Sequence, residues 1–234
     1  MGIPKPVRPE YSATIPSSGK RIKYQPFSVK EEKVLILAAE SKDLDEITNA
    51  IHNVIKSCVT TAGFDPNDLA LFDVEYLFLR CRAKSIGESI SVKITDPSDP
   101  SYTVDHKILI DKIQVHKEKS HKDVIELDDK LSIKMRYPDI SFFNNGIDIS
   151  DVAAGVSTIS RCISQIVVDG EEYNREDMTN KELEEWVEGL TQAQFSKLRV
   201  FFETMPRLQH KITLKNKNTG NDFTVVLEGL SDFF

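Results

Sequence analysis

The spacing of apolar residues changes twice along the chain. In residues 28–87, apolar residues recur at intervals of three and four, which is typical of amphipathic helices. In residues 88–137 they alternate with polar residues, which predicts antiparallel strands, and in residues 138–208 the helical spacing returns. The predicted fold class is therefore α+β, with capped amphipathic helices flanking a small antiparallel β module.

The two ends of the chain follow neither helical pattern. Residues 1–27 contain five prolines, which exclude a helix and predict an extended N-terminal arm with one short strand at Ile22 and Tyr24. Residues 1–16 carry few apolar side chains, so we expect this part of the arm to be mobile in the isolated protein. Residues 209–234 predict a C-terminal β-hairpin, turning near Asn218–Gly220, that runs into an apolar tail.

Most of the predicted helices have explicit start signals. SVKE, TNKE and TQAQ are capping boxes, beginning at Ser28, Thr179 and Thr191, and Asp43 opens a helix in the same way. Asp65 followed by Pro66 predicts the start of an apolar, buried helix. Asp148 or Ser150 is expected to cap a further helix with a regular apolar stripe. Its members are Ile149, Val152, Val156, Ile159, Ile163 and Ile166.

The β module over residues 88–137 begins with a predicted hairpin whose long loop is TDPSDPS. Its alternation predicts one apolar face packed on helices. That face includes Ile90, Val92, Tyr102, Val104 and Ile108.

The last residues raise a separate question. Leu230, Phe233 and Phe234 follow at positions i, i+3 and i+4, so one helical turn would place all three on one face. Burying each phenylalanine is worth about 1.5–3 kcal/mol. The tail can dock in the protein's own core or anchor in a neighbouring protein, and the sequence leaves both alternatives open.

Composition narrows the class of protein. The chain has 234 residues and a formal charge of −7, with 40% hydrophobic and 29% charged residues, as in ordinary globular proteins. The acidic balance and the mixing of basic with acidic residues argue against nucleic-acid binding. No apolar run approaches a membrane span, and the start lacks the apolar stretch of a signal peptide, so we expect no membrane association and a cytosolic protein. Cys58, Cys81 and Cys162 are expected to be buried thiols.

No catalytic or cofactor-binding motif is complete. SGKR at residues 18–21 lacks the upstream glycine of a phosphate-binding loop, and the paired carboxylates fall in turns or on helix surfaces. His116 and His121 flank a lysine-rich turn and are expected to be solvated; bound zinc, if found, would implicate them together with His106. We therefore predict no catalytic residue, no cofactor and no metal, and hence no enzyme.

Three stretches resemble one known family. ATIPSSGKRIKYQPFSVKEEKVLILAAES near the start, FLRCRAKSIGES in the middle and VVLEGLSDFF at the end resemble the baseplate hub subunit and hub assembly protein family of large contractile-tailed bacteriophages. The resemblance covers nearly the whole chain in order. The turns DPSDPSY and KNKNTGN contain no cysteine, so no zinc site is carried over.

The resemblance implies a non-enzymatic structural or assembly role in the tail baseplate. It also implies that the protein is made late in infection. Expected partners are other baseplate hub or tail proteins, and the expected location is the host cytoplasm during assembly and then the virion tail. A tail-assembly chaperone that binds the tape-measure or another hub protein is an alternative, and a hydrolase with a dispersed site is the alternative from a different class. Residues expected to bind a partner are Pro26, Phe27, Leu230, Phe233 and Phe234.

Overall fold

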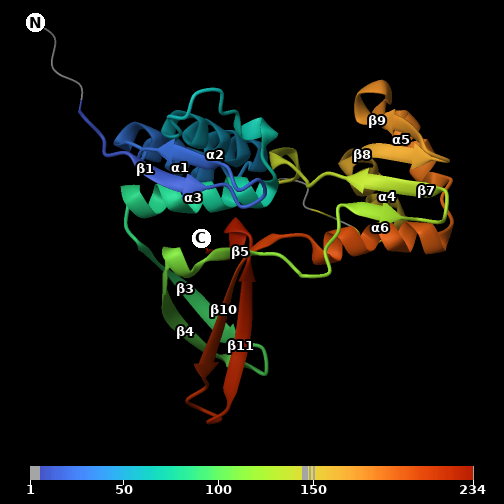
Figure 1. Ribbon diagram of the computed structural model, residues 1–234. Coiled ribbons are helices and arrows are strands. Elements are labelled where there is room, and N and C mark those ends of the chain that lie inside the picture. Colours follow the sequence, from blue (N-terminus) through green and yellow to red (C-terminus); the bar gives the residue numbers. More distant parts are fainter. Residues whose placement is uncertain (1–5, 144–146, 148, 150, 234) are drawn as a thin grey trace, which may run out of the picture. The chain divides into compact units, whose positions relative to one another are not determined.

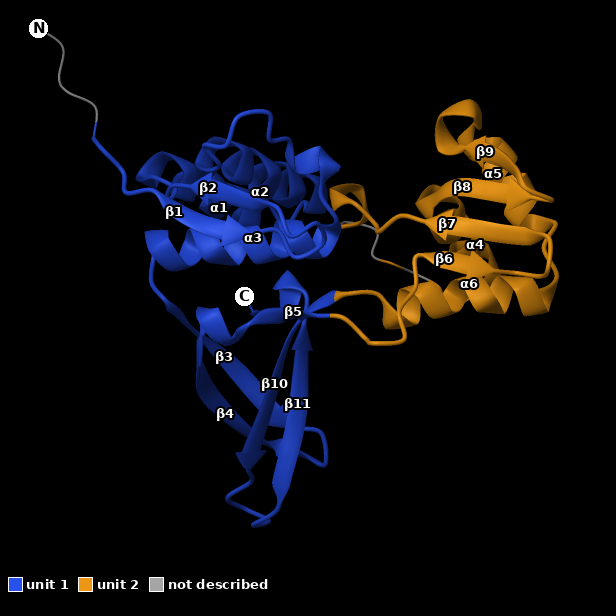
Figure 2. Ribbon diagram, viewed as in Figure 1, with its two compact units in different colours: residues 1–116, 207–234 blue, residues 117–206 orange. Residues whose placement is uncertain are grey.

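The computed structural model describes all residues except 1–5, 144–146, 148, 150 and 234. It contains two compact units (Figure 2): unit 1 consists of residues 1–116 and 207–234, and unit 2 consists of residues 117–206. Helices and small antiparallel sheets occur in both units, which confirms the α+β fold class.

Three helices form one part of unit 1: α1 (Val29–Ser41), α2 (Leu44–Cys58) and α3 (Leu71–Ser85) (Figure 1). The capping box at Ser28 and the Asp43 cap are present as predicted. Pro66 starts only a short 3-10 helix, Pro66–Asp68, and α3 begins at Leu71 after a non-helical Ala70. As expected, α3 is buried along most of its length, because both α2 and strands of unit 1 pack against it.

Residues 11–24 contain more regular structure than the prolines of residues 1–27 predict. Strands β1 (Tyr11–Thr14) and β2 (Arg21–Tyr24) form an antiparallel hairpin, where only one strand was expected. Pairing satisfies the backbone of both strands, and alternate side chains can then be buried. Ala13 and Ile15 are part of the core of unit 1, so the segment expected to be mobile contains core residues.

Two further hairpins pack together in unit 1. One consists of β3 (Ser89–Asp96) and β4 (Asp99–Leu109), with a tight turn at residues 97–98 in place of the expected long loop. The other consists of β10 (Arg207–Lys215) and β11 (Asp222–Glu228), which confirms the predicted C-terminal hairpin. Strand β5 (Gln114–His116) pairs with β10.

Contacts between the two hairpins explain where the predicted apolar face lies. Ile90, Val92 and Ile108 are buried, and Tyr102 packs edge-on against Phe223 with ring centroids 6.1 Å apart. The face expected to pack on helices thus contacts both the second hairpin and the short helix that follows it, residues about a hundred positions or more later in the chain.

Unit 2 is built around one antiparallel sheet of order β6-β7-β8-β9. The strands are β6 (Val124–Glu126), β7 (Leu131–Met135), β8 (Ile163–Val168) and β9 (Glu171–Asn174). The strands within residues 88–137 therefore belong to three different sheets, which differs from the single β module expected there. Sheet partners that come from later in the chain, β8 for β7 and β10 for β5, account for the difference.

The helices of unit 2 are α4 (Val152–Cys162), α5 (Asn180–Glu188) and α6 (Gln192–Thr204). Both predicted capping boxes are present, at Thr179 and Thr191. The cap of α4 is Asp151, whose Oδ1 accepts from the Ala154 N–H at 2.9 Å; the two expected cap residues, Asp148 and Ser150, lie outside the described residues.

The apolar stripe predicted for α4 crosses an element boundary. The helix ends at Cys162, and Ile163 and Ile166 belong to β8, where they are buried by pairing with β7 and by the core of the unit. Asp169 and Gly170 both have positive φ, 49° and 88°, and form the tight turn between β8 and β9. Their Asp-Gly sequence is a strong hairpin signal that the helical spacing obscured. The three cysteines are free and buried, as predicted.

Candidate functional site

The N-terminal pair of residues expected to bind a partner is buried within unit 1. Pro26 and Phe27 lie between β2 and α1, and Phe27 is only 6% exposed. The Phe27 N–H donates to Ser85 Oγ at 2.8 Å, and the Pro26 carbonyl accepts from Arg8 Nη1 at 2.8 Å. The first bond connects the start of α1 to the end of α3, and the second connects it to the segment before β1, so both bonds have a structural role.

The C-terminal residues are also docked in unit 1. Leu230 and Phe233 lie in the short 3-10 helix η5 (Leu230–Phe233) and are 3% and 2% exposed. The Asp232 carboxylate accepts from the Glu228 N–H at 2.8 Å, which closes the turn. The sequence left open whether the tail docks internally or in a neighbouring protein, and Leu230 and Phe233 dock internally. Phe234 lies outside the described residues.

Two buried carboxyl groups on α3 hold the terminal segments. Glu75 Oε1 accepts from the Leu230 N–H at 3.0 Å, and Asp73 Oδ1 accepts from the Ser17 N–H at 2.9 Å. Burial raises the pKa of Glu75 to about 7, although the Leu230 N–H acts in the opposite direction, and burial also raises the pKa of Asp73. Gly229 has φ +66°, and a Cβ there would lie 3.1 Å from Glu75 Oε1, so this position favours glycine.

The most apolar exposed surface of unit 1 lies on α1. Only Ala38 of this helix is buried, and α2 is the element against which α1 packs. Five of the 14 exposed large apolar side chains in the described residues fall within residues 29–44, so exposure of this kind is concentrated here. We define the α1 surface as these five, which are 44–80% exposed: Val29, Val34, Ile36 and Leu37 on α1, and Leu44 at the start of α2.

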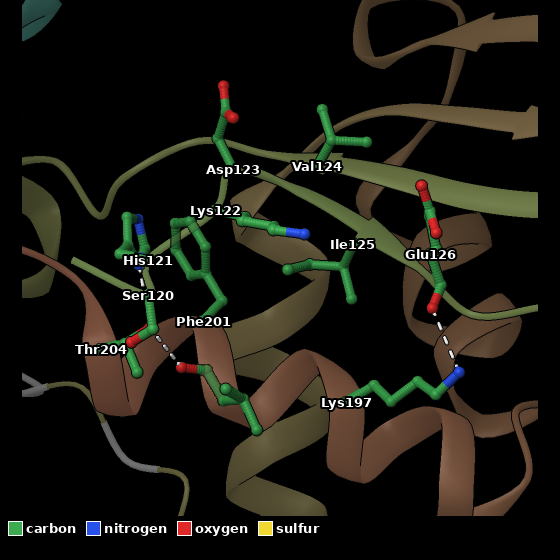
Figure 3. A pocket seen from close by; sticks show the side chains of 11 residues that line it. Ser120, His121, Lys122, Asp123, Val124, Ile125, Glu126, Lys197, Phe201 and Thr204 are labelled. Atoms are coloured by element: carbon green, nitrogen blue, oxygen red, sulfur yellow. Dashed lines mark hydrogen bonds between the residues drawn. The ribbon is translucent and has the colours of Figure 1, made fainter. Parts of the chain in front are cut away.

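A groove of about 600 Å³ lies in unit 2 between the edge strand β6 and helix α6 (Figure 3). One wall is residues 120–126, and the other is one face of α6, formed by Lys197, Val200, Phe201 and Thr204 at helical spacing. Ile125 points toward α6, and Val124 lies on the opposite side of the strand (Figure 3). We call this feature the β6–α6 groove.

Aromatic rings form one end of the β6–α6 groove. His121 stacks on Tyr137 and packs on Phe201, with ring centroids 5.6 Å and 4.9 Å away. Its Nδ1 lies 3.0 Å from Thr204 Oγ1, whose hydroxyl donates to the Val200 carbonyl at 2.8 Å. Since that oxygen is already a donor, His121 donates through Nδ1–H. His121 is thus buried, contrary to the expected solvation, and burial lowers its pKa.

A second cavity of unit 2, of about 740 Å³, has carboxylates in its lining, including Asp128 and Asp169. Asp128 Oδ1 accepts from the N–H groups of Lys130 and Leu131, both at 3.0 Å, and these bonds help to lower its pKa. Asp169 pairs with Lys130 at 2.9 Å. A general acid needs a raised pKa, so this arrangement is that of turn-stabilising carboxylates and does not favour the hydrolase alternative.

The search for metal and membrane features covers the described residues. No group of three or more His, Cys, Asp or Glu side chains among them is arranged to hold a metal ion. In the same part of the chain, no helix is both long and apolar enough to cross a membrane.

An exposed apolar helix face and an open groove beside a sheet edge define a class of protein that works by binding other proteins. The chain belongs to the family described as T4 bacteriophage base plate protein, whose family model matches residues 8–234. This membership gives the protein a structural or assembly role in the phage tail baseplate, with other tail proteins as its partners. No curated protein and no solved structure matches the chain.

Proposed function

We propose that the protein is a non-enzymatic subunit of the baseplate hub and that its α1 surface binds a neighbouring hub protein. The observation that carries the proposal is the concentration of exposed apolar side chains on α1. A helix in water normally turns its apolar residues to the core. On α1 the opposite is found: the core receives Ala38, and Ile36 and Leu37 are each more than half exposed.

The arrangement of the α1 surface fits a protein partner. Val29 and Ile36 are two turns apart, and Val34 and Leu37 are one turn apart, so the four side chains form two short rows on the exposed side. Covering each of these side chains contributes about 1.5–3 kcal/mol before the cost of association. Lys30 and Lys33 project from the same side of the helix between these apolar side chains, so a partner must also accommodate two positive charges.

The occupant that we propose is an apolar surface of another hub protein. Family membership supports this choice, since a baseplate family implies contacts with other phage tail proteins. The buried positions of Leu230 and Phe233 also support it, because the internal docking of these two tail residues makes α1 the more accessible apolar surface of unit 1.

A complementation experiment tests the proposal. A phage that lacks this gene is supplied with the wild-type protein or with the double variant Ile36→Glu, Leu37→Glu. Because both side chains are exposed, the variant should keep the wild-type melting temperature but should fail to support baseplate assembly. Val152→Glu is the matched control, since Val152 is 53% exposed on α4 of unit 2. Normal baseplates with the double variant would overturn the proposal.

The same material distinguishes a resident subunit from a chaperone. Mass spectrometry of purified virions should detect the protein in the tail baseplate. A protein absent from virions that co-purifies with the tape-measure or a hub protein from infected cells would identify a tail-assembly chaperone. In that case the α1 surface would bind its client only during assembly in the host cytoplasm.

A further inference from the structure

The outer edge of β6 in unit 2 carries backbone groups that no strand pairs. The Met135 N–H donates to the Asp123 carbonyl at 2.7 Å, and the Leu127 N–H donates to the Leu131 carbonyl at 2.8 Å. Backbone groups of successive residues alternate in direction along an antiparallel strand. Ile125, which lies between these two bonds and pairs with Ile133, therefore directs its N–H and C=O to β7. The groups of Val124 and Glu126 point to the open edge.

One of these edge groups is occupied by a side chain. Lys197 Nζ donates to the carbonyls of Glu126 and Leu127 at 3.2 Å and 2.7 Å, which closes one end of the edge. The N–H and C=O of Val124 and the N–H of Glu126 have no partner among the described residues. A row of open groups of this kind is a template for an additional strand.

The opposite edge of the same sheet provides a comparison. Strand β9 is exposed along its whole length and begins with Glu171 and Glu172, and charged residues of this kind protect an edge from pairing. Strand β6 instead presents Val124, which is 43% exposed, and the half-buried Ile125. β6 contains one charged residue, Glu126, where β9 contains two, so the β6 edge is the less charged and more apolar of the two.

The groove beside β6 can receive the side chains of an added strand. Val200 on α6 is 48% exposed and, with Ile125 and Phe201, provides an apolar lining. A volume of about 600 Å³ is in the range of binding pockets. An edge strand supplies backbone hydrogen bonds, and a neighbouring pocket supplies selectivity for alternate side chains.

We propose that unit 2 binds an extended segment of another tail protein as a fifth strand on the outer edge of β6. Alternate side chains of this segment enter the β6–α6 groove, and at least one of them is apolar and contacts Val200 and Ile125. The Val124 N–H and C=O and the Glu126 N–H pair with the backbone of the segment. This site lies in unit 2 and does not depend on the α1 surface of unit 1, so either can fail alone.

The first test uses an array of overlapping synthetic peptides that covers the tail proteins encoded by the same phage, with the full-length protein as the analyte. A binding peptide is then resynthesised with N-methyl groups at every second residue, in two alternate sets. Only one set removes the N–H groups that face β6. We expect that set to abolish binding and the other set to leave it within about twofold. Equal loss with both sets would overturn strand addition. A peptide that binds as a helix uses the backbone N–H groups of both sets for its own hydrogen bonds, so either set of N-methyl groups would disrupt it.

Two proline variants provide the matched test on the protein. Val124→Pro removes an N–H that points to the open edge, so pairing with β7 is preserved, and proline is tolerated on edge strands. Glu172→Pro makes the same change on the open edge of β9, because the residues that flank the two-residue turn, Val168 and Glu171, form the hydrogen-bonded pair. We expect Val124→Pro to weaken binding about tenfold or more and Glu172→Pro to leave binding unchanged.

Other occupants give different results. Hydrogen exchange should show new protection of the Glu126 amide when the peptide binds. Binding that survives Val124→Pro in a variant with a wild-type circular dichroism spectrum would overturn the proposal. A concentration-dependent dimer that Val124→Pro abolishes would replace it with pairing between two copies of β6. If Val124→Pro does not fold, the N-methyl peptides and the Glu126 amide decide the question alone.

Discussion

Replacing Glu75 by glutamine should stabilise unit 1 at neutral and alkaline pH. The Glu75 side chain lies in the interior, where its Oε1 accepts from the Leu230 N–H at 3.0 Å. A glutamine can keep this acceptor and carries no charge. Burial raises the pKa of Glu75 from an ordinary value of 4.5 to about 7, so the folded protein retains a proton that the unfolded chain releases.

The sign and size of the effect follow from this difference in proton binding. Below pH 4.5 the Glu75 carboxyl group is protonated in both the folded and the unfolded state, so its ionisation does not lower the free energy of unfolding. Between pH 4.5 and pH 7 the folded state binds more protons, so the free energy of unfolding falls as the pH rises, and above pH 7 it is constant. At about 1.4 kcal/mol for each pH unit, the total loss is about 3 kcal/mol. The new amide N–H₂ needs a partner, which can cost about 1–3 kcal/mol.

The assay is urea denaturation of wild type and Glu75→Gln at several pH values, followed by far-ultraviolet circular dichroism. We expect the variant to gain about 3 kcal/mol at pH 8 relative to its difference from wild type at pH 4.5, because the cost of the new amide is the same at both pH values and cancels. Trp186 is the single tryptophan and lies on α5 in unit 2, so its fluorescence serves as a reference for that unit. Glu40→Gln is the control, because Glu40 is exposed on α1.

The test depends on how the difference in the free energy of unfolding between wild type and Glu75→Gln changes with pH, and not on the absolute stability of either protein. Asp73 also has a pKa raised by burial, but it is present in both proteins and its contribution cancels in the difference. A difference between wild type and Glu75→Gln that stays constant from pH 4.5 to pH 8 would show that the Glu75 carboxyl does not titrate as its burial implies.

Two further predictions concern interior contacts of unit 1. Phe233→Ala should lower the free energy of unfolding by about 3–5 kcal/mol in urea titrations, because the ring is 2% exposed; an unchanged midpoint would contradict internal docking of the tail. Asn216→Ala should cost about 2–4 kcal/mol, because the buried amide donates to Asp96 Oδ2 at 2.7 Å and Asp99 Oδ2 at 3.1 Å and its loss strands a buried carboxylate. The exposed Asn221→Ala should change stability by less than about 0.5 kcal/mol, and equal losses in the two variants would refute the role of the buried amide.

Local chemistry determined the starts of α1, α2, α5 and α6 and the final hairpin directly from the sequence. The capping boxes at Ser28, Thr179 and Thr191 are present, because a cap depends on side chains and backbone groups only three residues apart. Alternation likewise predicted a hairpin within residues 209–234, since its two strands are neighbours in the chain. The buried cysteines follow from apolar context alone.

Tertiary structure decided everything that depends on distant partners. Ile163 and Ile166 fit a helical stripe, but β7 was available to pair with them, and pairing ended the helix at Cys162. His121 follows a polar turn, but the face of α6 carrying Phe201 covers it.

The same reason separates the expected partner-binding residues from the surfaces that the structure exposes. An apolar residue in a sequence predicts burial without stating what covers it. Leu230 and Phe233 are covered by unit 1 itself, whereas Ile36 and Leu37, in an equally apolar stretch, have no covering element among the described residues and are left exposed. Which apolar residues remain for a partner is fixed by the packing of distant segments, and no local pattern carries that information.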